Sequence, residues 1–511
     1  MAEGSTPISD ATIDVLVVGG GTAGATVAGI LARDTDLRVL LLEAGPDYGP
    51  LSAGRWPADL LEARCLPGSH GWGYSGLAHP SHDTPTSFDR ARVIGGCSAH
   101  NGCVALLGHR RDYDHWAELG NTGWDWESVA PAFERAKRGL RVRLVDDAEV
   151  TPYQRAFVEG AVASGIPRVL DLNDPDDVSA VAPSPVNIHD GRRWNAALGY
   201  LDPVRERPNL TVVGRALVDR VEVRAGRAVA VQAIVAGERR RFPARRVVLA
   251  AGAYGSPAVL QRSGIGAVEE LGALGIAPVH DLPGVGRRLA DHPTVVLEYR
   301  GAPELDQTME EFGGAHWLPD EQTLVKTQSR RCREAFDLHL YAVSNHDRDT
   351  GVWRYVVDVS SMAPVSFGSV ALTSADPEAA PTIDHGYLSD PEQRDLNVLI
   401  DGVEIARRIM GWAGNRRRLA GELQPGPEVG TRDEIAGWVQ RRVGIYYHPG
   451  CSCRMGPASD PEAVVDTDGK VHGLDGLYVC DASIFPTLMR ANTNLPAAML
   501  AEHLAGRIGE L

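Results

Sequence analysis

The sequence predicts an α/β fold built from more than one folding unit. Its 511 residues exceed the size of a single ordinary hydrophobic core, so two or three units are expected, whether consecutive or interleaved. A content of 43% hydrophobic and 23% charged residues is typical of globular proteins, and 56 glycines with 33 prolines predict many loops. Apolar runs and glycines near the start of the chain then indicate strands alternating with a helix.

The stretch "IDVLVVGGGTAGATVAGILARDTDLRVLLLEAG" is expected to form a strand, a glycine turn, a helix and a second strand. Apolar residues 15–18 suit a strand buried within a parallel sheet. Small residues 23–28 favour a helix that packs close to that sheet. This succession is typical of a Rossmann-type dinucleotide-binding unit.

Three glycines in this stretch, Gly19, Gly21 and Gly24, form the pattern G-x-G-x-x-G. They would provide a tight turn, backbone access to a pyrophosphate, and close packing of a helix whose N-terminus faces the phosphate charge. Glu43 ends the second strand, where a carboxylate can accept a hydrogen bond from a ribose hydroxyl. The alternative is an incidental glycine-rich turn, against which the strand, the spacing and the acidic residue all argue. The motif alone does not separate FAD from NAD.

Charge and targeting features bear on the class of partner. A formal net charge of -16 argues against nucleic acid or an anionic membrane as the binding partner. The start of the chain lacks a basic segment followed by an apolar run, and no apolar stretch is long enough for a membrane span. We therefore expect a cytoplasmic protein. The seven cysteines suit reduced thiols better than a disulfide framework, and "CSC" at 451–453 is too isolated for a metal site.

Further motifs follow the glycine turn in a fixed order. They read "ARVIGGCSAHNGCVALLGHRRDYDHWAELGNTGWDW", "GAYGSPAVLQRSGIG", "YYHPGCSCRMG" and "LYVCDASIFPTLMRANTNLPAAMLAEHLA". The first two resemble the two signatures of the glucose-methanol-choline (GMC) flavin oxidoreductases. The last two resemble the catalytic histidine motif and the closing flavin-binding helix of that family. The resemblance runs from about residue 13 to about residue 507.

This resemblance implies the GMC architecture, in which a Rossmann-type FAD-binding domain is interleaved with a substrate domain made of a β-sheet and helices. The FAD-binding domain would combine residues 10–150, 205–295 and 440–511, and the substrate domain residues 151–204 and 296–439. Within the latter, the runs "EAFDLHLYAVS" and "WRYVVDVSSMAP" predict strands. The run "DPEQRDLNVLIDGVEIARRIMG" has apolar residues at helical spacing and predicts a helix that covers the sheet.

The stretch around His100 bears on how the cofactor is held. The GMC family usually has a small or aliphatic residue at this position. By contrast, "GGCSAHNGC" resembles the choline oxidase branch, in which a histidine is joined covalently to the 8-methyl carbon of the flavin. The resemblance therefore makes His100 the candidate for a covalent bond to FAD. The alternative is a His100 that packs or hydrogen-bonds beside a noncovalent FAD.

The same resemblance assigns other cofactor contacts. Gly96, Asn101 and Gly102 would lie along the flavin edge, and the backbone of Val218 in "RALVDRVEV" would hold the adenine. Asp481 in "VCDASIFP" would help to position the ribityl and pyrophosphate portion. For Asp481, the alternative is an aspartate that only caps a turn.

Oxidation of an alcohol requires a proton acceptor near the hydroxyl group and a flat electron sink on the other side of the carbon. By its motif "YYHPG", His448 is expected to be the base, because a neutral imidazole accepts a proton at physiological pH. The motif alignment assigns Asn494 in "ANTNLP" to hold the alcohol oxygen, with Asn492 two residues away as the residue that could be mistaken for it. His292 in "LADHP" is interpreted as structural.

The expected function is that of an FAD-dependent alcohol oxidase or dehydrogenase that acts on a small-molecule alcohol. Oxygen or another acceptor would take the electrons, and a homodimer is left open. Two other classes stay open as well: a redox-neutral lyase with a GMC-like fold, and a flavin-carrying binding protein without turnover. The His448 motif favours alcohol oxidation over both.

Substrate identity is not settled by these motifs. The segment "SSMAPVS" has no histidine where choline oxidase has a second one, so the sequence does not identify choline as the substrate. Residues 304–322 are acidic with an aromatic residue, which would suit a lid that favours cationic or polyhydroxylated alcohols. The next segment, "KTQSRRCRE", is basic, and both segments also fit solvated loops.

Overall fold

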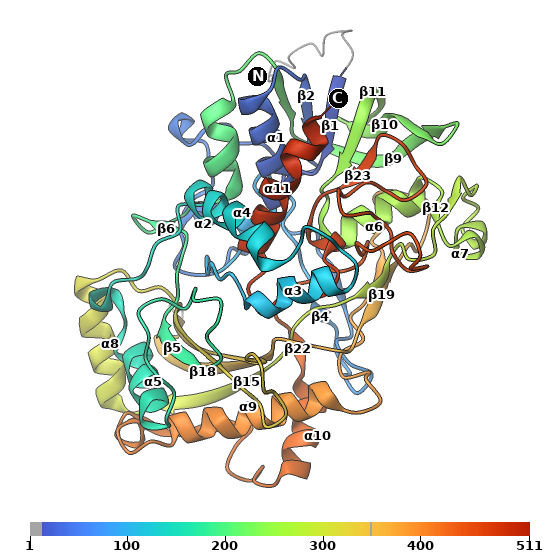
Figure 1. The fold of residues 1–511 in the computed structure, drawn as a ribbon. Coiled ribbons are helices and arrows are strands. Elements are labelled where there is room, and N and C mark those ends of the chain that lie inside the picture. The colour runs from blue at the N-terminus through green and yellow to red at the C-terminus, as the bar shows by residue number, and fades with distance from the viewer. Residues whose placement is uncertain (1–12, 348–349, 511) are drawn as a thin grey trace.

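The computed structural model describes residues 13–347 and 350–510 and confirms the predicted α/β fold (Figure 1). Two large sheets organise the chain, with α1 against the first and α5, α8 and α9 against the second, while α11 packs against α1 and α4. The helices are α1 (Thr22–Asp34), α2 (Ala58–Leu61), α3 (Arg110–Glu118), α4 (Trp126–Gly139), α5 (Pro152–Ala163), α6 (Gly252–Arg262), α7 (Val268–Ala273), α8 (Pro303–Ala315), α9 (Arg394–Met410), α10 (Arg432–Arg442) and α11 (Asn494–Gly509).

The first sheet is built around the strand that the glycine motif follows. Its order is β8 (Leu210–Val213), β2 (Val39–Leu42), β1 (Ile13–Val18), β11 (Glu238–Leu249), β10 (Arg227–Val235) and β9 (Ala216–Arg224), and β23 (Leu477–Val479) also pairs with β11. β1 runs parallel to both β2 and β11, so that Val17 lies between Leu41 and Val248. These three side chains are fully buried because helices cover the parallel part of the sheet. The predicted strand, turn, helix and strand are thereby confirmed.

The second sheet is antiparallel and supports the other half of the molecule. Its order is β21 (Leu419–Gln424), β15 (Pro293–Gly301), β18 (Val352–Ser361), β17 (Leu338–Asp347), β16 (Glu321–Thr327) and β5 (Ala180–Pro183), and β22 (Gly444–Ile445) also pairs with β15. β17, β18 and α9 confirm the two strands and the helix predicted for this region.

Short strands complete the structure in the connecting segments. They pair as β3 (Ser75–Gly76) with β4 (Thr86–Ser87), β6 (Ile188–His189) with β7 (Arg192–Arg193), β12 (Ile265–Gly266) with β13 (His280–Asp281), and β19 (Gly368–Ala371) with both β14 (Arg287–Leu289) and β20 (Thr382–Asp384).

Alternate side chains along β17 belong to two different hydrophobic cores, one on each face of the second sheet. Leu338 and Leu340 belong to the core that this sheet forms with α5 and α9. Tyr341, the next residue, belongs instead to the core of the first half. Successive side chains of a strand point to opposite faces, so one face of this sheet is turned toward the dinucleotide-binding half.

The second sheet draws on residues on both sides of two predicted domain boundaries. β15 begins at Pro293, and β22 lies at Gly444–Ile445, whereas the substrate domain was expected to run from 296 to 439. The partition of the whole chain into two domains stays a prediction.

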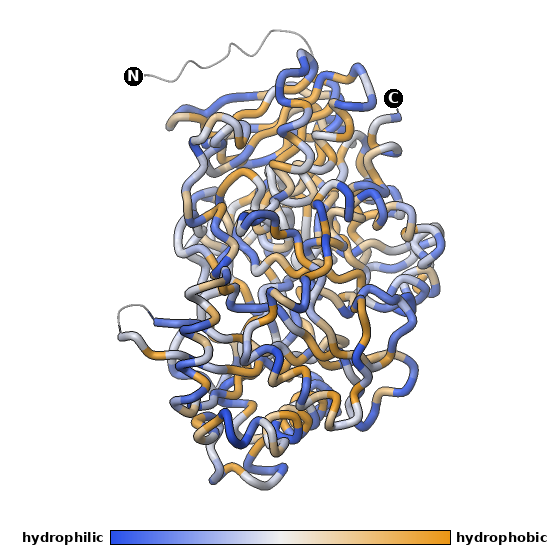
Figure 2. Tube along the Cα trace, turned by 90° about the vertical axis from the view of Figure 1, so that its left-hand side faces the viewer, coloured by the Kyte–Doolittle hydropathy of each residue, from blue (hydrophilic) through white to orange (hydrophobic). Residues whose placement is uncertain are grey.

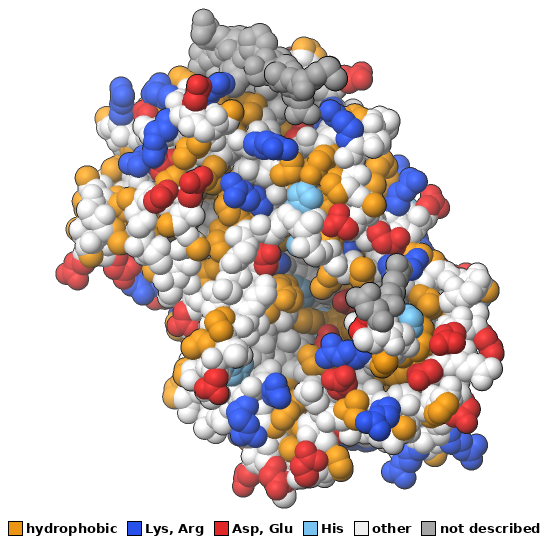
Figure 3. All heavy atoms as spheres, turned by 180° about the vertical axis from the view of Figure 1, so that it is seen from behind, with side chains coloured by type: hydrophobic (Ala, Val, Ile, Leu, Met, Phe, Trp, Pro, Cys, Tyr) orange, Lys and Arg blue, Asp and Glu red, His pale blue; other side chains and the backbone are white. Residues whose placement is uncertain are grey.

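Apolar segments gather in the interior of both halves, as Figure 2 shows. On the face in Figure 3, side chains of Lys and Arg are interspersed with those of Asp and Glu. No helix in the described part of the chain combines the length and the apolar character needed to cross a membrane.

Candidate active site and cofactor cradle

The glycine turn between β1 and α1 is shaped by contacts that exclude side chains. Gly19 has a φ of +95°, and a Cβ on it would lie 2.5 Å from the carbonyl oxygen of Ala250. A Cβ on Gly24 would lie 1.9 Å from the carbonyl oxygen of Gly19. Gly21, at the N-cap of α1, has only the Cα of Gly96 within reach, 3.8 Å from its Cβ position. The N-terminus of α1 therefore offers an open backbone surface that fits a pyrophosphate.

Glu43, which follows β2, holds this turn by hydrogen bonds to backbone N–H groups. Its Oε2 accepts the N–H of Gly20 at 2.8 Å, and its Oε1 accepts the N–H of Gly45 at 2.7 Å. Burial raises the pKa of the Glu43 carboxyl, while the two amides lower it. Each carboxylate oxygen retains a further lone pair for a hydroxyl group. Its predicted ribose contact stays a prediction.

The second glycine-rich stretch meets the first. A Cβ on Gly96, where φ is +53°, would lie 2.5 Å from the Cα of Gly21, so the two turns touch backbone to backbone. A short 3-10 turn at Gly96–Ala99 then leads to His100, whose Nε2 lies 2.5 Å from the carbonyl oxygen of Ser69. Burial lowers the pKa of His100. The imidazole is thus neutral near pH 7 and keeps a nitrogen lone pair.

Hydrogen bonds and close packing fix the positions of Asn101 and Gly102, the two residues after His100. The side-chain oxygen of Asn101 accepts the N–H of Cys103 at 3.1 Å, and its carbonyl oxygen accepts Nε–H of Arg193 at 2.7 Å. Gly102 is pressed against Glu321, whose Oε2 would lie 2.8 Å from a Cβ on the glycine. Contacts of Asn101 and Gly102 with a flavin stay predictions.

Two further predicted contacts lie on the first sheet. Val218 is buried in β9, and its carbonyl oxygen accepts Nη2–H of Arg262 at 3.4 Å. Asp481 follows β23 and accepts the N–H of Gly252 at 2.9 Å and the hydroxyl of Ser256 at 2.6 Å. It also accepts the N–H of Ser483 at 2.8 Å and so caps the short 3-10 helix Ala482–Ile484, which is compatible with the turn-capping alternative. Cofactor contacts of Val218 and Asp481 are untested.

His448 lies just after β22 and is 7% exposed. Its backbone N–H donates to Oδ1 of Asp291 at 2.8 Å, and its Nδ1 lies 3.0 Å from Nδ1 of His292. Burial, together with the charges of His292, Arg90 and His339, lowers the pKa of His448 well below its usual range. The imidazole is therefore held neutral and able to accept a proton at physiological pH.

Asn492 is the amide that contacts His448. Its Nδ2 lies 3.3 Å from Nε2 of the imidazole, and its Oδ1 accepts the hydroxyl of Tyr341 at 3.0 Å. The tyrosine fixes which end of the amide faces the histidine, because a hydroxyl proton binds the amide oxygen. The amide N–H of Asn492 and Nε2 of His448 therefore lie side by side.

Asn494, the residue predicted to hold the alcohol oxygen, lies beside α1, and no hydrogen bond joins it to His448. It is the first residue of α11, and its Oδ1 accepts the hydroxyl of Thr22 at the start of α1. Its buried Nδ2 has no hydrogen-bond partner among the described residues, so it can bind a group held at the glycine turn. The start of α11 directs Asn494 toward α1, while Asn492 in the preceding loop faces His448.

Sequence reasoning missed the support that His448 receives from Asp291 and His292. Asp291 accepts three donors, among them the hydroxyl of Tyr387 at 2.9 Å, and burial raises the pKa of Asp291 to about 7. A signal was present, because both contacting histidines precede a proline. The pairing of Pro293 with Ile445 between β15 and β22 brings these two His-Pro dipeptides together.

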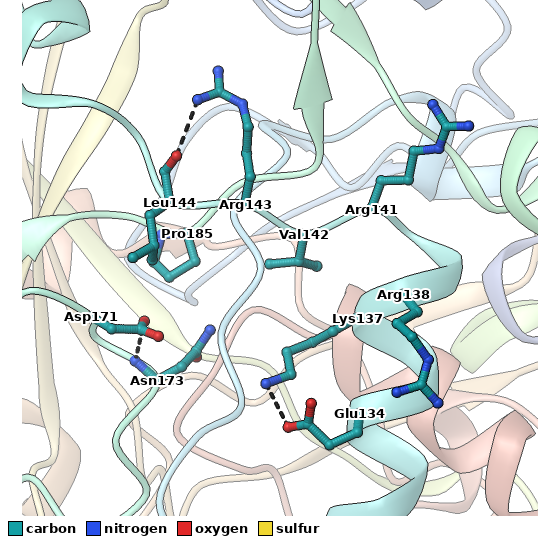
Figure 4. A pocket seen from close by; sticks show the side chains of 10 residues that line it. All are labelled: Glu134, Lys137, Arg138, Arg141, Val142, Arg143, Leu144, Asp171, Asn173 and Pro185. Carbon is teal, nitrogen blue, oxygen red and sulfur yellow. Dashed lines mark hydrogen bonds and ion pairs between the residues drawn. The ribbon is translucent and has the colours of Figure 1, made fainter.

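A hollow of about 320 Å³ lies apart from these residues, along the end of α4 (Figure 4). Its lining is rich in cations that already have partners. Lys137 pairs with Glu134 at 2.6 Å, and the guanidinium of Arg141 stacks 3.8 Å from the centre of the Trp194 ring. Its lining includes neither His448 nor Asn492.

The chain matches the models of one protein family and is similar to curated relatives over nearly its whole length. The family models described as GMC oxidoreductase match residues 13–294 and 364–501. The chain is 35% identical to an oxygen-dependent choline dehydrogenase of Paraburkholderia xenovorans, over 97% of this chain and 94% of the relative. It is 34% identical to one of Chromohalobacter salexigens, over 98% and 96% of the two chains.

Solved structures match over nearly the whole chain. Pyridoxine 4-oxidase from Mesorbium loti superposes with a TM-score of 0.85 at 28% sequence identity, covering 97% of this chain and 99% of that one. A fungal aryl-alcohol oxidase matches with a TM-score of 0.80 at 24% identity, covering 98% and 99% of the two chains, which supports the fold alone.

Proposed function

The chain belongs to the GMC oxidoreductase family and is an FAD-dependent oxidoreductase acting on CH–OH groups, and we propose that His448 is its catalytic base. The observation that carries this proposal is the buried, neutral imidazole of His448 with the amide of Asn492 3.3 Å from its Nε2. The alcohol oxygen replaces the contact between the amide N–H and Nε2, so that Nε2 takes the hydroxyl proton while the amide N–H donates to the same oxygen as negative charge develops there. FAD, when bound, supplies the electron sink that accepts the hydride from the alcohol carbon.

His292 holds His448 in the tautomer that this role requires. With the Nε2 lone pair directed at the substrate, Nδ1 of His448 carries the proton and donates it across the 3.0 Å contact to Nδ1 of His292. Asp291 fixes the backbone of both histidines by accepting their N–H groups at 2.8 and 2.7 Å. These contacts orient the ring before the substrate arrives.

The experiment that tests this function is anaerobic mixing of the FAD-loaded protein with primary alcohols such as choline, pyridoxine and benzyl alcohol. Loss of the visible flavin absorbance, with formation of the aldehyde, is expected for at least one of them. We assign the oxygen-contacting role to Asn492, so Asn492→Ala should slow the reduction by about 100-fold, the scale of a lost transition-state hydrogen bond.

Asn494→Ala is the matched comparison, because the residue lies two positions away and contacts Thr22 instead. It should weaken FAD retention and leave the reduction rate of the loaded protein within about threefold of the original, as expected for a residue outside the reacting pair. If Asn494→Ala slows reduction and Asn492→Ala does not, the assignment is wrong. Consumption of an alcohol-bearing substrate with the flavin oxidised throughout would instead indicate a lyase.

We also propose that His100 bonds covalently to FAD and that oxygen reoxidises the flavin. The neutral imidazole, close to where the two glycine turns touch, supports the first part. The names of the relatives, which include oxygen-dependent dehydrogenases and an oxidase, support the second. A cytoplasmic location and a homodimer stay predictions.

Acid precipitation followed by intact mass measurement tests the covalent bond. The yellow colour and the mass of FAD should stay with the chain and be lost completely in His100→Ala. Formation of hydrogen peroxide during aerobic turnover checks the role of oxygen. Release of free FAD from the unaltered protein would reduce His100 to a residue that packs near the flavin.

A further inference from the structure

Arg193 is a buried cation beside the turn that carries His100. It lies in β7 and is fully buried, whereas its neighbour Arg192 is exposed. Within the described part of the chain, the groups that accept from Arg193 are backbone carbonyls, and no ion pair joins it to a carboxylate. Burial of an unpaired cation costs free energy unless hydrogen bonds satisfy it, so its partners indicate what it is for.

The guanidinium of this arginine ties separate segments together. Its Nε–H donates to the carbonyl oxygen of Asn101 at 2.7 Å. Nη1 donates to the carbonyl oxygens of Leu60 at 2.8 Å and Asp59 at 3.4 Å, and Nη2 donates to that of Cys65 at 2.8 Å. Asn101 directly follows His100, and the other carbonyls belong to α2 and to the chain just after it. One planar group therefore holds the turn of His100 against this segment.

The same segment continues to Ser69, which contacts the imidazole. The Ser69 hydroxyl donates to Oδ2 of Asp59 at 2.5 Å, and the Ser69 carbonyl oxygen lies 2.5 Å from Nε2 of His100. A carbonyl oxygen only accepts, so Nε2 carries the proton and the ring keeps a lone pair on its other nitrogen. These contacts form a closed ring through Arg193, Asp59, Ser69, His100 and Asn101.

The charges around His100 favour its neutral form. Burial lowers the pKa of His100 most. The charges of Arg193 and Arg90 lower this pKa further, while the Ser69 carbonyl and the charge of Asp89 act in the opposite direction. An uncharged imidazole is the form that has a lone pair to react.

Glu321 packs against the next residue of the turn without neutralising this cation. Its Oε2 would lie 2.8 Å from a Cβ on Gly102. Burial raises the pKa of Glu321 to about 8, although the charge of Arg193 lowers it, so most of the carboxyl is protonated near pH 7. The positive charge of Arg193 therefore stays effective beside the turn.

We propose that Arg193 is the positioning residue for the attachment of FAD to His100. It fixes the turn through Asn101, and it fixes the imidazole through Asp59 and Ser69. This inference rests on the proposed covalent bond between His100 and FAD. A ring held in one place and kept uncharged reacts faster than a mobile or protonated one, because less has to be ordered before the bond forms.

The attachment step balances as follows. The lone pair of His100 forms a bond to the 8-methyl carbon, and the imidazole and the methyl carbon each lose one proton. The electron pair of the broken C–H bond reduces the flavin ring system, which takes up both protons. Dioxygen then accepts two electrons and two protons and leaves as hydrogen peroxide, so that oxidised FAD stays bound to the chain.

The full chain, produced in riboflavin-starved cells and then mixed with FAD in air, tests this role. Acid precipitation and intact mass give the attached FAD at successive times, and a series of FAD concentrations separates the saturating rate from the affinity. Arg193→Gln should lower the saturating rate about tenfold or more, and change the FAD concentration for half the maximal rate less than about threefold. A residue that serves folding alone would weaken FAD binding without this split.

Three further variants define what Arg193 contributes. Arg193→Lys keeps the charge and lacks the planar fork, so it should recover part of the rate. Ser69→Ala removes the contact with Asp59 at a partly exposed position, so the protein should fold normally and attach FAD about threefold or more slowly. Arg192→Gln is the matched control, because this neighbour is exposed and lies outside the ring of contacts. It should leave the rate unchanged.

The pH profile of attachment is a readout that packing alone would not move. Attachment slows as the pH falls and the imidazole becomes protonated. Loss of the Arg193 charge raises the pKa of His100, so this decline should move to higher pH in Arg193→Gln and stay in place in Arg193→Lys.

Outcomes that contradict this role differ from those that contradict the covalent bond. Normal attachment in Arg193→Gln and Ser69→Ala, or slower attachment that follows only from weaker FAD binding, overturns the role of Arg193 alone. Release of all FAD from the unaltered protein contradicts the covalent bond and this role together. Neither result affects oxidation of alcohols at His448, which flavin reduction measures separately.

Discussion

His448→Ala should leave a yellow, FAD-loaded protein whose flavin is reduced by the alcohol about 1,000-fold more slowly or worse. Proton transfer by a positioned side chain contributes about 10²- to 10⁴-fold to a rate, and alignment of the oxygen is lost with it. The imidazole is buried and hydrogen-bonded at both ends of its ring, so a small residue leaves a gap where the base stood. Stopped-flow measurement of anaerobic flavin reduction at saturating alcohol isolates this step from reoxidation.

Two companion variants separate base catalysis from packing. His448→Gln keeps a polar side chain beside Asn492 and lacks a base, so it should be almost as slow as the alanine variant. His115→Ala, on the exposed part of α3, should retain the original rate. An unchanged reduction rate in His448→Ala would rule out the base assignment.

Gly24→Ala should abolish FAD binding and destabilise the first half of the molecule. The added methyl group would lie 1.9 Å from the carbonyl oxygen of Gly19, a backbone atom that cannot move without opening the turn. Flavin absorbance of the purified protein and its thermal unfolding temperature measure the two effects. We expect no retained FAD and a large drop in unfolding temperature.

Two other glycines provide the controls for this prediction. Gly21→Ala meets no protein atom closer than 3.8 Å, so the apoprotein should stay folded while FAD binding weakens, because the methyl group faces the proposed pyrophosphate site. Gly506→Ala, in α11 with open space around it, should affect neither property. An FAD-loaded Gly24→Ala protein of normal stability would contradict the packing argument.

Local patterns were sufficient to predict much of the fold. Residues 15–18 read as a buried strand because an apolar run of this length can be buried on both faces only inside a parallel sheet. α9 could be predicted because it lies against one face of the second sheet, so its apolar residues recur at the helical period. The second sheet as a whole could not be predicted, since β5 and β16 meet across more than a hundred residues of chain.

In the candidate site, too, some residues could be identified from a local motif and others only from the fold. His448 was identified from a local motif, but choosing between Asn492 and Asn494 required the start of α11 and its approach to Thr22. The acidic segment 304–322 did not indicate what its carboxylates meet, because only the pairing of β16, β17 and β18 brings Glu321 and Asp358 to one face of the second sheet. Patterns along the chain indicate whether a segment forms a helix or a strand. The register between distant strands decides which side chains contact one another.

The first sheet contains β1 from the beginning of the chain and β23 from near its end. The helices α1 and α11 likewise come from the beginning and from residues beyond 476. α11 packs against α1, and the amide of Asn494 bonds to Thr22. During synthesis, the early strand and helix therefore leave the ribosome long before their late partners exist. The nascent chain has to shield an unfinished hydrophobic sheet through translation of the whole intervening region, and the complete cofactor cradle forms only after the last helix emerges.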